Sequence, residues 1–177
     1  MAGYFSACTF REIGNAATTQ NLITIENIDA TKLVYIRRVI IQMDATVALT
    51  AVMPLFKAAR ATGVPTGGTT LNKAQFDTAN ASNANTIVRG STATDGGANS
   101  GPVATLGTTL WQQFGMRLHT AVGQVLASDN SGVPQICDTQ ILILRQNEAL
   151  AIGIVAAAGT SNPATNMYFV QVVWEEN

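Results

Sequence analysis

Residues 167–175, Met-Tyr-Phe-Val-Gln-Val-Val-Trp-Glu, decide the fold class of this chain. Every second side chain from Tyr168 to Trp174 falls on one face, and the intervening side chains fall on the other. This two-residue period is typical of an extended strand, because successive side chains point to opposite faces. The segment therefore predicts a β-strand with at least one buried face.

A second long strand is expected at residues 32–43, where β-branched and apolar residues occur on both faces. Regular alternation predicts that its adjacent Arg37 and Arg38 point to opposite sides. Further strands are expected at 21–28, 46–56, 70–76, 86–89, 109–125, 139–144 and 150–157. The best helix candidate, 45–60, is disfavoured by Pro54 and by its Thr and Val content.

Turn-forming clusters separate these segments, at 29–31, 63–68, 94–102, 128–134 and 159–163. Residues 145–148 suggest a hairpin turn in which Asn147 takes a positive φ. Pro65-Thr-Gly-Gly-Thr predicts a turn rather than a phosphate-binding loop, because no Gly-Lys-Ser/Thr follows. We therefore expect an all-β chain that forms one β-sandwich domain.

Within its 177 residues, the sandwich is expected to span 20–177. Residues 1–19 are interpreted as an amino-terminal arm that contacts a partner, because they are weakly apolar. A long polar excursion is expected near 78–105, which is rich in Ala, Ser, Asn, Gly and Thr. Both regions are predicted contact regions.

Charged residues make up 12% of the chain, against roughly 25% in an average soluble domain. A surface so poor in charge resembles one that lies against other protein, which favours an oligomer over a free monomer. The net charge of −1 argues against nucleic acid as a partner, and no apolar run is long enough to span a membrane. The amino terminus does not resemble a secretion signal, so we expect synthesis in a cytoplasm.

Residues suited to catalysis or metal binding are scarce. His119 is the one histidine, and it is interpreted as a polar strand residue rather than a general base. Cys8 and Cys137 are expected to be buried thiols, with a disulfide between them as the less favoured alternative. A loop cation near Asp95 or Asp129 is a further disfavoured alternative. We expect no enzyme activity, no cofactor, and no catalytic, cofactor-binding or metal-ligating residue.

The aromatic residues offer one alternative binding chemistry, a sugar-binding platform. Core packing is favoured, because most of them fall in strand patterns. The residues concerned are Tyr35, Trp111, Phe114, Tyr168 and Trp174.

Seven segments resemble the small structural proteins encoded by tailed bacteriophages. They are Phe10-Arg-Glu-Ile-Gly14, Gln20-Asn-Leu-Ile-Thr-Ile-Glu-Asn27, Val34-Tyr-Ile-Arg-Arg38, Gln42-Met-Asp-Ala45, Pro65-Thr-Gly-Gly-Thr, Leu144-Arg-Gln-Asn-Glu-Ala149 and Val173-Trp-Glu-Glu176. The chain is similar to capsid decoration, or cement, proteins, which are jelly-roll sandwiches that often stand as trimers on the outer shell.

The resemblance implies a virion protein on the capsid surface, made in the host bacterial cytoplasm. Its expected partners are further copies of itself, as a homotrimer, and the major capsid protein of the phage head. Two alternatives remain open. One is a tail, fibre or baseplate component, and the other is a carbohydrate-binding jelly-roll module.

Overall fold

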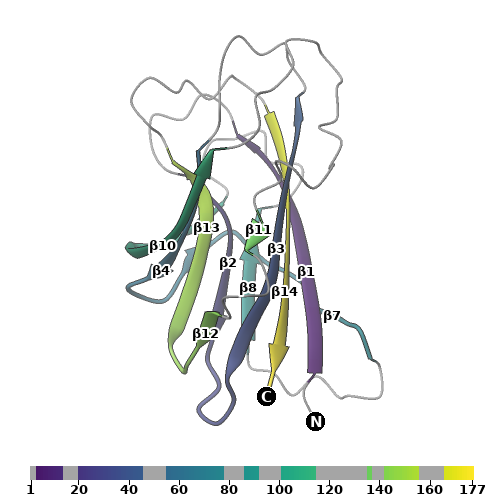
Figure 1. Cartoon of the computed structure of the whole chain (residues 1–177), viewed down its shortest axis with the longest axis vertical. Helices are drawn as coiled ribbons and strands as arrows, with labels where there is room; N and C mark the ends of the chain where they lie inside the picture. Colours follow the sequence, from purple (N-terminus) through teal and green to yellow (C-terminus); the bar gives the residue numbers. More distant parts are fainter. Residues whose placement is uncertain are drawn as a thin grey trace.

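The computed structural model describes residues 3–13, 20–45, 55–77, 86–91, 101–114, 135–136, 142–155 and 166–177. Within these ranges every regular element is a β-strand, and Figure 1 shows the strands in two facing sheets. No helix in the described ranges is long and apolar enough to cross a membrane. The expected all-β, sandwich-like single domain is confirmed.

One layer, sheet A, has the order β11-β3-β14-β1-β7, and β12 also pairs with β3. Its strands are β1 (Gly3–Ile13), β3 (Val34–Ala45), β7 (Ala74–Gln75), β11 (Gln135–Ile136), β12 (Leu142–Leu144) and β14 (Asn166–Glu176). All of its pairings are antiparallel. The carboxy-terminal β14 therefore lies between two other long strands.

The other layer, sheet B, has the order β10-β4-β13-β2-β8-β6. Its strands are β2 (Gln20–Asn27), β4 (Leu55–Ala61), β6 (Thr69–Thr70), β8 (Thr86–Gly90), β10 (Leu106–Phe114) and β13 (Glu148–Val155). A small additional sheet pairs β5 (Thr66–Gly67) with β9 (Pro102–Val103). The described amino and carboxyl ends lie close together at one end of the sandwich (Figure 1).

The core lies between the two sheets. From sheet A, β14 contributes alternate residues between Tyr168, which is 1% exposed, and Trp174, which is 0% exposed. From sheet B, Leu150 and Ile152 of β13 belong to the same buried cluster. Burying an apolar side chain of this size contributes on the order of 1.5–3 kcal/mol. The alternate residues that predicted β14 therefore also stabilise the folded state by packing in the core.

Most predicted strands are present where the structure describes them. β2, β3, β8, β13 and β14 lie within about two residues of their predicted bounds. The predicted strand 70–76 is divided between β6 in sheet B and β7 in sheet A. A helix over 45–60 is wrong for the part described, since 55–60 belong to β4. The expected jelly-roll connectivity stays a prediction.

The largest difference concerns the segment 1–19. Its described part, 3–13, forms β1, which pairs with β14 along its whole length. Phe5 and Ala7 are buried in the core, and Phe5 stacks on Trp174 at 5.9 Å between ring centroids. These residues belong to the sandwich rather than to an arm outside it. The segment was misjudged because only alternate residues need to be apolar in a strand that is buried on one face.

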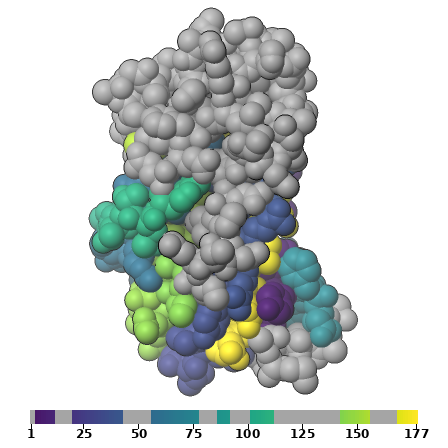
Figure 2. Space-filling view, in the orientation of Figure 1, coloured from purple at the N-terminus to yellow at the C-terminus, as the bar shows by residue number. Residues whose placement is uncertain are grey.

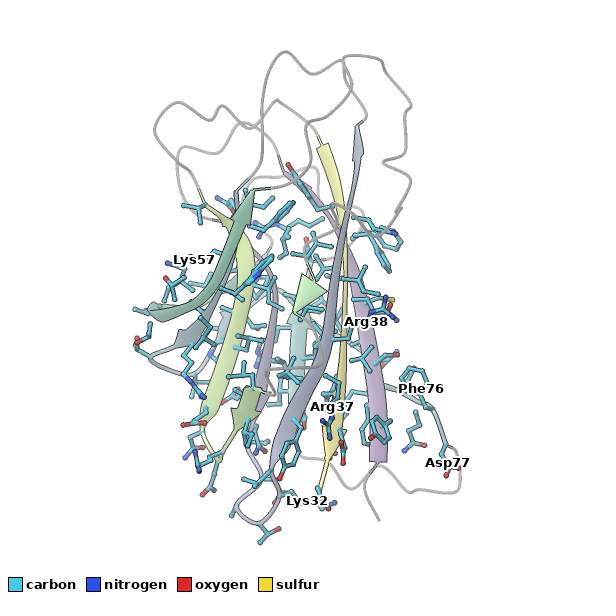
Figure 3. The ribbon with its side chains drawn as sticks, in the orientation of Figure 1. Lys32, Arg37, Arg38, Lys57, Phe76 and Asp77 are labelled. Carbon is cyan, nitrogen blue, oxygen red and sulfur yellow. The ribbon has the colours of Figure 1, made fainter. Side chains whose placement is uncertain are left out.

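The direction of the two arginines in β3 also differs from the expectation. Val173 pairs with Arg38 and Trp174 pairs with Ile36, so Arg37 is an extra residue opposite β14. This β-bulge shifts the alternation by one residue, and the buried positions change from Val34 and Ile36 to Val39 and Ile41. Arg37 and Arg38 therefore both lie outside the core (Figure 3).

Two predicted turns are confirmed. Asn147 has a φ of 62°, and the Glu148 amide donates to the Arg145 carbonyl over 3.0 Å. Gly67 and Gly68 have φ values of 66° and 62°, and a Cβ on Gly68 would lie 2.5 Å from the Gly90 oxygen. Glycine is required there, because other residues disfavour positive φ and no space remains for a side chain. Gly67 and Gly68 therefore form the predicted turn.

Of the expected polar excursion near 78–105, the ranges 78–85 and 92–100 lie outside the described residues. The predicted strand within it is present as β8, which pairs with β2. Thr86 and Val88 of β8 are buried. This part of the region belongs to the sandwich.

Candidate interaction face

The outward side of sheet A presents a broad, largely uncharged surface, called here the open face. It consists of Tyr4, Ser6, Cys8 and Phe10 of β1, Phe169, Gln171, Val173 and Glu175 of β14, and Tyr35, Arg37, Arg38, Ile40 and Gln42 of β3. All of these residues except Glu175 are at least partly exposed. Figure 2 shows β1, β7 and β14 side by side at the surface, in purple, teal and yellow.

Strand register arranges the open face in four rows across β1, β14 and β3. The rows are Tyr4–Glu175–Tyr35, Ser6–Val173–Arg38, Cys8–Gln171–Ile40 and Phe10–Phe169–Gln42. Neighbouring strands are about 4.8 Å apart, and every second residue advances roughly 7 Å. The rows therefore cover an area roughly 20 Å long and 10 Å wide.

Aromatic rings lie at both ends of the open face. Tyr4 is 46% exposed and Phe10 is 43% exposed. Phe10 lies against Phe169, with 5.0 Å between ring centroids. Exposed aromatic residues on a regular sheet face are typical of the centre of a protein contact.

The charges of the open face gather around the β3 bulge. Arg37 donates to Glu175 through Nε, over 2.8 Å to Oε2, and also through Nη2. The Arg37 guanidinium carbon lies 5.6 Å from the Tyr35 ring centroid. Arg38 is exposed and forms no ion pair within the described residues. The bulge thus places on the same side of the sheet one arginine paired with Glu175 and one that has no ion pair among the described residues.

The outward side of sheet B, called here the closed face, is built differently. It includes the small residues Ala59 of β4, Ala151 of β13 and Thr24 of β2, which are at most 1% exposed. Glu26 is 3% exposed, and its Oε2 has no hydrogen-bond partner among the described residues. Burial raises the pKa of Glu26, although the positive charge of Arg89 opposes this shift. These residues of the closed face are therefore buried, and they include a carboxyl group whose pKa is raised by desolvation.

A buried polar cluster around Arg11 and Thr9 connects the two sheets. Arg11 is 3% exposed, and it donates from Nη1 to the Asn21 carbonyl and from Nη2 to Gln20 Oε1 over 2.6 Å. Thr9 Oγ1 donates to the Ser91 carbonyl over 2.6 Å. Burial lowers the pKa of Arg11. These bonds connect β1 of sheet A with sheet B, so we assign the cluster a structural role.

The adjacent acids Glu175 and Glu176 point to opposite sides of β14. Glu175 faces outward to Arg37, whereas Glu176 accepts hydrogen bonds from Trp174 Nε1 and Thr86 Oγ1, each over 2.7 Å. Lys73 has its pKa lowered by burial, and the charge of Glu176 opposes that shift. Both carboxylates serve structural contacts and do not share a site.

The remaining residues singled out from sequence are dispersed. Trp174 and Tyr168 lie in the core and Trp111 packs against it, as core packing predicted. Cys8 is exposed, so its expected burial is wrong. The side chain of Phe114 is not described, and Cys137, His119, Asp95 and Asp129 lie outside the described residues. Within the described ranges, no group of three His, Cys, Asp or Glu residues is placed to hold a metal ion.

Sequence reasoning missed the open face as a unit. Tyr4 and Phe10 were assigned to an arm, and Arg37 and Arg38 were assigned to opposite sides. The alternation of Tyr4, Ser6, Cys8 and Phe10 with Phe5, Ala7 and Thr9 is the signal that predicts a strand there. The register that brings β1 beside β14 has no comparable signal in the sequence.

Comparison with known proteins adds no relative to this description, since no family model, no curated protein and no solved structure matches the chain.

Proposed function

We propose that this chain is a structural protein of a tailed-phage virion that decorates the outer surface of the head and stabilises the shell. The observation that carries the proposal is the open face, whose charged residues are the Arg37–Glu175 ion pair and Arg38. Such a surface can bury a large area with little desolvation of charge. The low charge of the whole chain, 12%, points in the same direction.

A decoration protein needs only to bind the assembled lattice more tightly than the free subunits, because preferential binding stabilises the bound state. The resemblance of the seven sequence segments to phage structural proteins supports the lattice as the partner. A homotrimer is the proposed form, since closed symmetry gives each copy an equivalent place on a shell.

Purified particles of the phage that encodes the chain test this proposal. Quantitative mass spectrometry of these particles should find the chain in hundreds of copies per head. A dozen or fewer copies would place it at the tail, in a fibre, baseplate or connector, and absence from the particle would overturn a virion role. Light scattering on the purified chain should give about three times 18.6 kDa if it forms a trimer before binding.

A further inference from the structure

We infer that the open face binds a protein surface that carries apolar side chains opposite Tyr4 and Phe10 and a carboxylate opposite Arg38. This inference rests on the proposed function, because the shell is the partner it describes. It adds which side of the sandwich meets the partner and what chemistry that partner presents.

The aromatic rows supply the apolar part of the contact. Tyr4 and Phe10 are nearly half exposed, although both belong to a strand that is paired with β14 along its whole length. Phe76 extends this surface beyond β7, since it is 65% exposed and its amide donates to the Tyr4 carbonyl over 3.0 Å (Figure 3). Tyrosine, phenylalanine and arginine are the residue types enriched at interface centres.

The charges of the open face indicate which charge the partner surface must carry. Arg37 is neutralised by Glu175, so it can be covered without a new partner charge. Arg38 lies one residue away and forms no ion pair within the described residues. Covering a lone guanidinium is unfavourable unless a carboxylate pairs with it. A partner that fits this face therefore brings an Asp or Glu side chain to the bulge.

The same charges disfavour a two-fold contact between two open faces. Such a contact places the same residues on both sides of the interface. Within the four rows, Glu175 is the one acid, and Arg37 already holds it. Two apposed open faces would leave both Arg38 side chains without a carboxylate from the rows.

The size of the face sets a limit on its contribution. The rows span roughly 20 Å by 10 Å, whereas a stable interface buries about 800 Å² on each partner. The open face is therefore one part of a larger contact, in which a few side chains dominate the binding energy. Substitutions of its exposed residues should have large effects on affinity and small effects on folding.

Co-sedimentation with heads of the encoding phage, prepared without this chain, tests the inference. The informative variants are Arg38→Glu and the double variant Tyr4→Ser with Phe10→Ser. We expect each to bind the heads about tenfold or more weakly than wild type, while Arg38→Lys retains most of the binding. Arg145→Glu is the charge-matched control at an exposed turn, and Leu110→Ser is the exposed apolar control on β10, so both should bind normally.

The outcomes separate the inference from the proposed function. If wild type binds heads and all open-face variants bind equally well, the open face is not the contact, although the capsid role stands. If wild type fails to bind heads and is absent from particles, the proposed function itself is overturned. If Tyr4→Ser with Phe10→Ser abolishes self-association measured by light scattering but leaves head binding unchanged, the face joins copies of this chain instead. Unchanged thermal melting of each variant confirms that folding is intact.

Discussion

The two outward sides of the sandwich share one strand geometry but differ in the residues they present. The open face carries Tyr4, Phe10 and Arg38, which are exposed, whereas the closed face carries Ala59 and Ala151, which are buried. Alternation alone makes both sets face away from the core. Outward-facing positions in this chain are therefore of two kinds, which differ in side-chain size and in burial.

Deletion of residues 1–8 should have the largest effect, because it removes part of a strand that builds the open face. It removes part of β1, including Phe5 and Ala7, and so breaks the pairing with β14 that builds one column of the open face. We expect loss of the cooperative thermal transition and of the β-rich circular dichroism spectrum, because both the core and the ladder are interrupted. Deletion of residues 1–2 is the control. A cooperative transition in the longer deletion would mean that β1 is dispensable.

A matched pair of substitutions then compares the faces directly. Ala151→Arg on the closed face is expected to lower the free energy of unfolding by about 3 kcal/mol or more, because it buries a charge and overpacks the space beside Thr24 and Ala59. Ser6→Arg on the open face should change it by only about 0.5 kcal/mol or less. Urea denaturation measures both. Equal losses in the free energy of unfolding would show that neither face accommodates an added arginine better than the other.

Breaking the ion pair of the open face should have a smaller effect. Glu175→Gln leaves Arg37 without its charge partner, in a pair whose side chains are 29% and 10% exposed. We expect a loss of about 0.5–1 kcal/mol in the free energy of unfolding, since water still screens the arginine. Arg38→Gln is the neighbouring control and should cost less, because Arg38 forms no ion pair within the described residues.

The smallest expected effect is the pH dependence that Glu26, on the closed face, gives to the free energy of unfolding. Because burial raises the pKa of Glu26 in the folded state, the folded chain binds that proton more tightly than the unfolded chain. The contribution of Glu26 to stability is therefore fully present below the unfolded pKa, near 4.5, and is lost as the pH rises through the folded pKa.

Denaturation of wild type and Glu26→Gln at pH 4 and pH 7 measures this contribution as a difference. Asp29 and Glu148 have lowered pKa values, chiefly from hydrogen bonds with Thr31 and the Arg145 amide, so they change stability in the opposite direction in both proteins. We expect Glu26→Gln to gain stability relative to wild type at pH 7 and to lose that advantage at pH 4. A constant difference between the two pH values would exclude Glu26 as the titrating group.

Local sequence predicted a substantial part of the fold. The alternation from Tyr168 to Trp174 identified β14, and the residues around Asn147 identified a hairpin turn, because these features depend on near neighbours. The candidate face was harder to predict from the sequence. Its rows join β1, β14 and β3, which are distant in the chain, and no local pattern specifies their order or register.

Local residue patterns therefore establish the all-β class, the strands β2, β3, β8, β13 and β14, the turns at Gly67-Gly68 and Asn147, and the low charge of the chain. Tertiary structure decided three further features: that residues 3–13 pair with β14, that a bulge turns Arg37 and Arg38 to the same side, and that Cys8 is exposed. The physical reason is that side-chain alternation is a property of single strands, whereas pairing, bulges and burial depend on which strands become neighbours.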